Sequence, residues 1–128
     1  MQLSISEQAN QLIKHIDILL NSTQRLDVNF RIKLEKIEFK MDEFVTEYHT
    51  HFALSISEYA SYLNHDALSP LTIVLGYSEL FRSIHAHMLT LEEINILNQI
   101  CDMSRLLTDS LRDECKVMVA KRNELSRI

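Results

Sequence analysis

The sequence predicts an all-α protein, and three observations support this prediction. The 128 residues include a single glycine, Gly76, and a single proline, Pro70. Sheet proteins need turn-forming residues about every 8–12 positions, so a chain with only one glycine and one proline favours long helices. Apolar residues recur at alternating spacings of three and four, which is typical of a packed helix face. Two segments also begin with the Ser/Thr-x-x-Glu pattern of a helix-capping box.

Composition and charge exclude several functions. The net charge of −5, from 13 basic and 18 acidic side chains, provides no basic surface for nucleic acid or for an anionic membrane. The chain has no apolar stretch of the roughly 18 residues that a membrane span needs and no signal-peptide pattern, so we expect a cytoplasmic protein. Cys101 and Cys115 are spaced neither for a disulfide within one helix nor for zinc, and we expect both to be buried hydrophobes.

The first half of the chain contains two predicted helices. The first begins at the capping box of Ser4 and Glu7 and ends before the turn-forming residues 21–23. The second has its apolar face over residues 30–48, with charged residues on its outer face. We therefore assign residues 1–51 to an N-terminal helical extension, which fits either a coiled coil or extra helices packed on a bundle.

The second half predicts two longer helices. The apolar spacing slips to 48, 52 and 56, a stutter that we expect to leave the helix unbroken. The apolar face then continues to residue 84, so we predict a helix over 52–84. We expect a kink at Pro70, because proline removes a hydrogen bond and crowds the carbonyl four residues earlier. The capping box of Thr90 and Glu93 predicts a loop at 85–90 and a last helix from Leu91 to residue 122.

These two long helices define the predicted architecture of residues 52–128. The short loop between them makes an antiparallel hairpin. One hairpin cannot bury so wide an apolar face alone, whereas two hairpins from two chains close a four-helix bundle. We therefore predict a homodimer with a dimeric four-helix bundle.

A stripe of polar residues follows the outer face of helix 52–84. His65 takes the outermost heptad position, and Ser69 and Thr72 follow at spacings of four and three. An exposed imidazole is accessible to a phosphoryl donor, and the neighbouring Asp66 can hydrogen-bond one ring nitrogen and make the other more nucleophilic. The pattern indicates nucleophilic chemistry at His65.

The residues around His65 resemble a known motif. The run from Asn64 to Thr72, Asn-His-Asp-Ala-Leu-Ser-Pro-Leu-Thr, resembles the H-box of the dimerisation and histidine-phosphotransfer domain of two-component sensor histidine kinases. The following run from Ile73 to Leu80 is also similar to that family, as is the segment 103–111 to its second bundle helix. The resemblance covers residues 55–120 or thereabouts, and its most specific part is the His-Asp-x-x-Ser-Pro-Leu-Thr string.

The resemblance implies roles for five residues. His65 would be the phosphoacceptor and Asp66 the acidic neighbour that assists transfer. Ser69 stands where the family has the polar residue that positions water for dephosphorylation of a partner response regulator. We assign Leu68 and Thr72, on the same surface, to partner binding.

The sequence departs from the family pattern at two residues and in one domain. Ala67 replaces a bulkier apolar residue, and Leu68 stands where a basic residue or asparagine is common, which puts docking of an ATP-binding domain in doubt. Few residues follow position 122, and one glycine cannot supply the glycine-rich boxes of an ATP-binding domain. We therefore expect no ATP-dependent kinase activity, and any phosphate on His65 would come from another protein.

Three functions fit these residues. The first is a dimeric phosphotransfer protein that exchanges phosphoryl groups between His65 and the aspartate of a response-regulator receiver domain. The second is a non-catalytic adaptor that binds a response regulator or a histidine kinase and modulates its signalling. The third is the core of a longer sensor kinase in which residues 1–50 form the signalling helix.

We predict no cofactor and no metal site. Two pairs of histidines, His49 with His51 and His85 with His87, are each spaced by two residues. This spacing places the two members of a pair on diverging sides of a helix, so they cannot bind one metal ion together.

Overall fold

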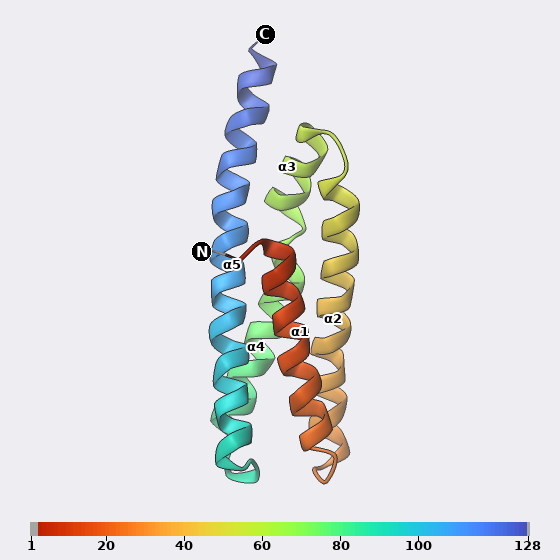
Figure 1. Cartoon of the computed structure of the whole chain (residues 1–128), viewed down its shortest axis with the longest axis vertical. Coiled ribbons are helices and arrows are strands. Elements are labelled where there is room, and N and C mark those ends of the chain that lie inside the picture. The colour runs from red at the N-terminus through yellow and green to blue at the C-terminus, as the bar shows by residue number, and fades with distance from the viewer. Residues whose placement is uncertain (1–2, 128) are drawn as a thin grey trace.

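The computed structural model describes residues 3–127, which form five α-helices and one short 3-10 helix and contain no strand (Figure 1). The elements in chain order are α1 (Ile5–Ser22), α2 (Val28–Phe52), α3 (Ile56–His65), α4 (Leu68–Ile84), η1 (Ala86–Met88) and α5 (Leu91–Ser126). The all-α prediction is confirmed. No helix in this part of the chain is both long and apolar enough to cross a membrane.

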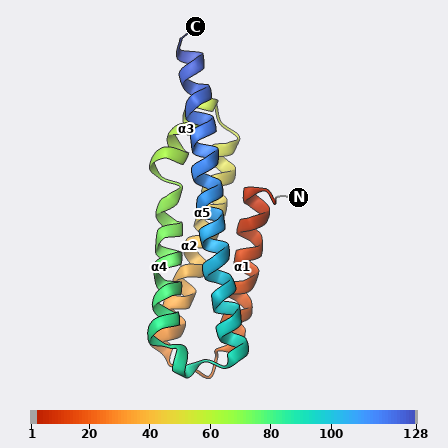
Figure 2. The ribbon, with the colours of Figure 1, turned by 90° about the vertical axis from the view of Figure 1, so that its left-hand side faces the viewer.

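The helices alternate in direction and enclose one core. In Figure 1, α1 runs down, α2 up, α3 and α4 down in succession, and α5 up. Helix α1 packs against α2 and α5, and the α3–α4 pair packs against the same two helices on the opposite side (Figures 1 and 2). The α3–α4 pair thus acts as one broken helix, and the chain forms a four-helix bundle by itself.

Both predicted apolar faces in the first half of the chain point into this core. All the predicted positions of α1 and α2 are buried: Ile5, Ala9, Leu12, Ile16, Leu19, Phe30, Leu34, Ile37, Met41, Phe44 and Tyr48. They meet Leu71, Val74 and Phe81 of α4 in one cluster. Burial of each such aliphatic side chain contributes about 1.5–3 kcal/mol, so α1 and α2 supply much of the hydrophobic stabilisation.

This arrangement corrects the argument for a two-chain bundle. That argument required a hairpin with no partner in its own chain, whereas α1 and α2 cover the apolar face of α4 and α5. Local spacing shows that a face is apolar but not which helix covers it. The cysteine prediction is also corrected in part, because Cys101 is buried and Cys115 is only half-buried.

Helix 52–84 is interrupted twice. Helix α2 ends at Phe52, and α3 begins after Ser55, whose Oγ accepts a hydrogen bond from the Glu58 N–H (3.2 Å). The prediction of an unbroken stutter is therefore wrong. Residues 55–58 are a Ser-x-x-Glu pattern, so a capping signal for this start was present in the sequence.

The second interruption lies at residues 66–67, before the kink predicted at Pro70, and it separates two helices instead of bending one. Pro70 lies in the first turn of α4 and has no N–H to offer the Asp66 carbonyl, which instead accepts from the Ser69 N–H (3.3 Å). The N–H groups of Asp66 (2.9 Å) and Ala67 (3.1 Å) both donate to the Tyr62 carbonyl. The backbone therefore breaks directly after His65.

The capping box at the start of the last helix is present as predicted. Thr90 Oγ1 accepts from the Glu93 N–H (3.1 Å), and the Glu93 carboxylate accepts from the Thr90 N–H (2.9 Å). The predicted loop over 85–90 and the start at Leu91 are confirmed. The predicted end at residue 122 is too early, because α5 continues to Ser126.

Candidate functional site

His65 lies at the outer surface of the break between α3 and α4. It is the last residue of α3, and its side chain is exposed, as its heptad position predicts. The neighbouring Asn64 points toward α5, where its Oδ1 lies 3.9 Å from Cys115 Sγ. The imidazole is therefore accessible from solvent on a surface held by the α3–α5 contact.

Asp66 and Ser69 lie on the side of the break that faces α2. Both are exposed, and both line a cavity of about 370 Å³ between α2 and α4. The wall from α2 includes Lys40, Glu43, Glu47 and His51. No hydrogen bond within residues 3–127 joins His65 to Asp66 or to Ser69, so the hydrogen bond expected between His65 and Asp66 is not formed.

Thr72 lies on the other side of α4, toward α5. It is exposed, its hydroxyl donates to the Leu68 carbonyl (3.0 Å), and it lines a cavity of about 530 Å³ between α4 and α5. The single stripe predicted from His65 through Ser69 to Thr72 is thus divided between two cavities. The break changes the phase between His65 and α4, but Ser69 and Thr72 both lie within α4. They line separate cavities because α2 and α5 pack on either side of this helix, which spacing within one helix cannot show.

Leu68 is less exposed than predicted. It is half-buried and packs against the hydrophobic core as the first residue of α4. The prediction placed it at an outward position of a continuous helix. The break turns the start of α4 so that this apolar side chain contacts the core, which is the lower-energy place for it.

The cavity beside Thr72 contains two arginines that the sequence analysis did not single out. Arg105 pairs with Glu79 and lies 3.5 Å from Asp102. Arg112 lines the same cavity and has no ion pair among the residues that the structure describes. The cavity therefore has a free cation on α5 opposite Thr72 on α4.

Gly76 lines this cavity from the middle of α4. A helix-interior glycine costs about 1 kcal/mol relative to alanine. A Cβ atom at this position would meet no heavy atom within 4 Å, and the residue is exposed. Packing within the chain therefore does not require a glycine here. Gly76 therefore leaves its backbone bare at the edge of this cavity.

An aromatic cluster supports α3 behind His65. The Tyr59 hydroxyl donates to the Tyr48 hydroxyl (3.2 Å), and the His51 ring stacks on Tyr62 with centroids 4.2 Å apart. Burial raises the pKa of all three tyrosines above their ordinary value. The Tyr62 hydroxyl is buried and has no hydrogen-bond partner within residues 3–127. These rings hold α3 against the end of α2 and so position His65.

Among residues 3–127, no group of three or more histidine, cysteine, aspartate or glutamate side chains is arranged to hold a metal ion. The chain matches no protein-family model, and comparisons with curated proteins and with solved structures found no significant similarity.

Proposed function

We propose that the protein is a histidine phosphotransfer protein of two-component signalling, with His65 as the phosphoacceptor. The observation that carries this proposal is the exposed His65 imidazole, which lies at a helix break within the H-box-like sequence. The phosphoryl donor and acceptor is the aspartate of a response-regulator receiver domain.

The reaction needs only groups of the two proteins. A ring nitrogen of His65 attacks the phosphorus of the aspartyl phosphate, the P–O bond to the carboxylate breaks, and a P–N bond forms. The aspartate carboxylate is the leaving group, and the imidazole releases its other ring proton to solvent or to Asp66. The reverse reaction returns the phosphoryl group to a receiver. No nucleotide takes part, and we propose no kinase activity.

Two neighbours of His65 have proposed roles. Asp66 is exposed next to the imidazole, and a rotation of its side chain brings its carboxylate toward the ring. Ser69 carries a hydroxyl one turn further along, on the α2 side, where it would position water for dephosphorylation of the receiver. The roles of both residues rest on the resemblance to the H-box.

The cavity between α4 and α5 that Thr72 lines, which we call the α4–α5 groove, is the proposed docking site for the receiver. It lies on the same side as Thr72, carries the free Arg112 guanidinium, and has a bare backbone at Gly76. These features suit a protein surface that approaches closely. Leu68, half-buried at the start of α4, would border this contact.

The adaptor function remains the second candidate because no hydrogen bond orients His65 toward Asp66. In that function the same groove binds a response regulator or a histidine kinase without chemistry. A homodimer is also proposed, although the core of the chain does not require one, and its interface is argued in the next subsection.

A transfer assay tests the proposal. Receiver domains are phosphorylated with acetyl phosphate, freed of donor, and mixed with the protein, and acid-labile phosphate on the protein is measured. We expect labelling of the wild-type protein and of His87→Ala, a matched control at another exposed histidine. We expect none on His65→Ala. Receiver binding without labelling would support the adaptor function instead.

A further inference from the structure

The bundle has four helices in its lower half but three in its upper half. Helix α1 begins at Ile5, level with Ser110 of α5, where Gln8 Nε2 donates to the Ser110 hydroxyl (3.1 Å). Of the helices within residues 3–127, only α2, α3 and α5 continue above this level, so no helix lies above α1 in this part of the chain (Figures 1 and 2). Residues 110–126 of α5 extend about 24 Å, at 1.5 Å per residue, without a helix on that side.

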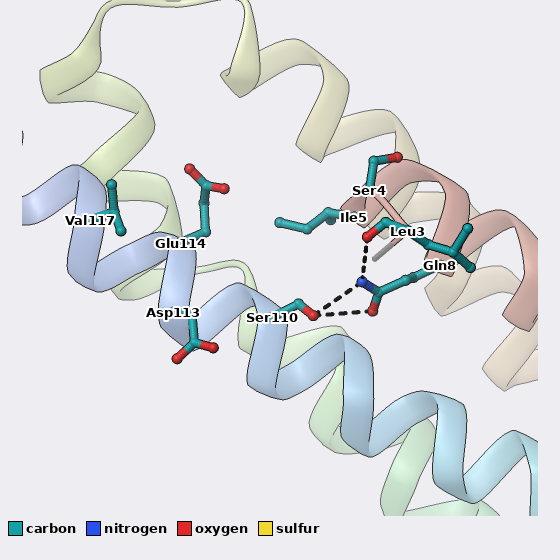
Figure 3. Close-up of a pocket in the computed structure, with 8 residues that line it drawn as sticks. All are labelled: Leu3, Ser4, Ile5, Gln8, Ser110, Asp113, Glu114 and Val117. Carbon is teal, nitrogen blue, oxygen red and sulfur yellow. Dashed lines mark hydrogen bonds between the residues drawn. The ribbon is translucent and has the colours of Figure 1, made fainter. Parts of the chain in front are cut away.

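A groove lies at this position, and we call it the upper groove. It is lined by Ile5, Tyr48, Phe52, Glu114 and Val117. Two adjoining cavities of about 350 and 550 Å³ lie in it and share Ser4, Ile5 and Glu114. Figure 3 shows Asp113, Glu114 and Val117 of α5 along one of these cavities, beyond the first turn of α1. The groove therefore lies where a fourth helix would continue α1.

The upper groove has both polar and apolar walls, and its apolar side chains are incompletely covered. The Phe52 ring contacts Tyr48 and Tyr59, with centroids 5.8 and 5.4 Å apart, yet it is 61% exposed. Val117 of α5 is 50% exposed and lines the adjoining cavity. Exposed apolar side chains on two helices that line adjoining cavities are typical of a helix-binding site.

The end of α5 is a helix without support. Its last two turns project beyond the turn between α2 and α3 (Figures 1 and 2). Residues 120–127, which we call the α5 tip, are exposed except for the half-buried Arg122, and Leu125 is 55% exposed. Short helical segments are marginal in water without tertiary packing. The molecule thus has a helix that lacks a partner next to a groove that lacks a helix.

The α5 tip and the upper groove match in charge and in helix direction. The α5 tip carries three basic side chains, Lys121, Arg122 and Arg127, and one acidic side chain, Glu124. Glu114 lines both cavities of the upper groove and Asp113 lines one of them, with the two carboxylates on different sides of α5 (Figure 3). An α5 tip from an inverted second molecule would run in the same direction as α1 and would bring its basic end to these carboxylates. Antiparallel neighbours are the arrangement of a four-helix bundle.

We infer that two copies of this chain form a symmetric dimer by exchanging their α5 tips, each tip lying in the upper groove of the other copy. The interface is isologous, because each copy contributes one tip and one groove. The exchanged tip lies diagonally across the bundle from α3, so His65 stays accessible in both copies. The inference does not depend on phosphate transfer by His65.

Sedimentation velocity on the full chain tests the dimer. We expect a concentration-dependent dimer for the wild-type protein. Phe52→Asp in the upper groove and Leu125→Asp in the α5 tip should each raise the dissociation constant of the dimer about tenfold or more, as loss of a buried anchor does. Phe39→Asp is the matched control, because Phe39 is 63% exposed on α2 and lines none of the cavities of the upper groove. Circular dichroism shows that each variant folds.

A mixing experiment distinguishes exchange from any other contact. Phe52→Asp retains an intact tip and Leu125→Asp retains an intact groove, so their mixture forms one intact tip-in-groove contact per dimer. We expect the mixture to associate more tightly than either variant alone. A wild-type monomer at all concentrations, a dimer indifferent to both variants, or a mixture no tighter than its components would overturn the inference.

Discussion

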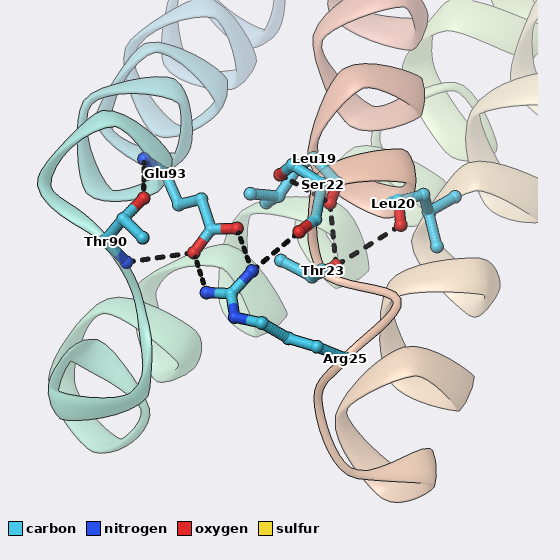
Figure 4. A network of polar contacts seen from close by, with 7 residues as sticks. All are labelled: Leu19, Leu20, Ser22, Thr23, Arg25, Thr90 and Glu93. Atoms are coloured by element: carbon cyan, nitrogen blue, oxygen red, sulfur yellow. Dashed lines mark hydrogen bonds and ion pairs between the residues drawn. The ribbon is translucent and has the colours of Figure 1, made fainter.

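Arg25 and Glu93 join the two halves of the chain at the lower end of the bundle. Arg25, in the turn between α1 and α2, donates hydrogen bonds of 2.8 and 2.5 Å to the two carboxylate oxygens of Glu93 in the first turn of α5 (Figure 4). The Glu93 side chain is 4% exposed and also accepts from the Thr90 N–H. This bidentate pair fixes α1 and α2 on the C-terminal helices.

Loss of the Glu93 carboxylate should destabilise the whole bundle. Glu93→Ala removes two charge-assisted hydrogen bonds and half of the capping box, which we expect to lower the free energy of unfolding by about 1–3 kcal/mol. Urea denaturation measures the change. The matched control is Glu79→Ala, whose partner Arg105 is also exposed (45% and 44%). That substitution should cost less than about 1 kcal/mol, and equal losses for the two variants would contradict the role of Glu93.

Stability should fall in acid because of the same carboxyl group. The Glu93 pKa is lowered from 4.5 to about 2, mainly by the hydrogen bonds from Arg25. The stabilisation is therefore complete above pH 4.5 and is lost as the pH falls through 2, because the unfolded state takes up the proton first. Urea titrations across this range should show a shallower decline for Glu93→Gln than for the wild-type protein. Parallel curves would show that Glu93 does not contribute.

Glu38 should lower the stability of the protein as the pH rises through neutrality, whereas Glu93 lowers it in acid. It faces Asp17 of α1, and this contact, with burial and the nearby Asp42 and Glu35, raises the Glu38 pKa from 4.5 to about 7. The folded state holds the proton more tightly, so the favourable contribution is complete below pH 4.5 and is lost as the pH rises through 7. Glu38→Gln should therefore be more stable than the wild-type protein at pH 8, with a smaller difference at pH 4. Thermal melting at the two pH values measures this.

Gly76→Ala should separate stability from docking. No atom lies within 4 Å of the added Cβ, so the helix propensity of alanine should stabilise the protein by about 1 kcal/mol. The same methyl group should slow phosphoryl transfer from a receiver domain while leaving labelling by the small donor phosphoramidate unchanged. Transfer rates and phosphoramidate labelling are compared on one preparation. Unchanged transfer in the more stable variant would remove the α4–α5 groove as the docking site.

Much of the fold follows from local patterns. The apolar positions of α1 and α2 and the capping box at Thr90 depend on neighbours within one helix, and the structure agrees with each. The break after Phe52 was missed although Ser55 and Glu58 carry its capping signal, because the stutter offered a competing explanation. The partner of the hairpin was missed for a different reason. Arg25 and Glu93 are 68 positions apart, and no local pattern encodes that pairing.

The site was predictable only up to the helix break. The heptad position of His65 predicts its exposure, since exposure depends on one helix face. The placement of Ser69 and Thr72 in separate cavities depends on where α2 and α5 lie beside α4, which spacing within one helix does not specify. The role proposed for Gly76 in docking rests on the empty space around its backbone, which no local pattern in the sequence shows.

The position of the phosphoryl group tests the central claim most directly. The protein, labelled with 15N in its six histidines, is mixed with a phosphorylated receiver domain, and nitrogen–phosphorus coupling is measured by NMR. We predict one phosphorus-coupled imidazole, that of His65, and no coupling in His65→Gln. Coupling at another histidine, or no coupling while a bound receiver keeps its phosphate, would contradict the assignment of His65 as the phosphoacceptor.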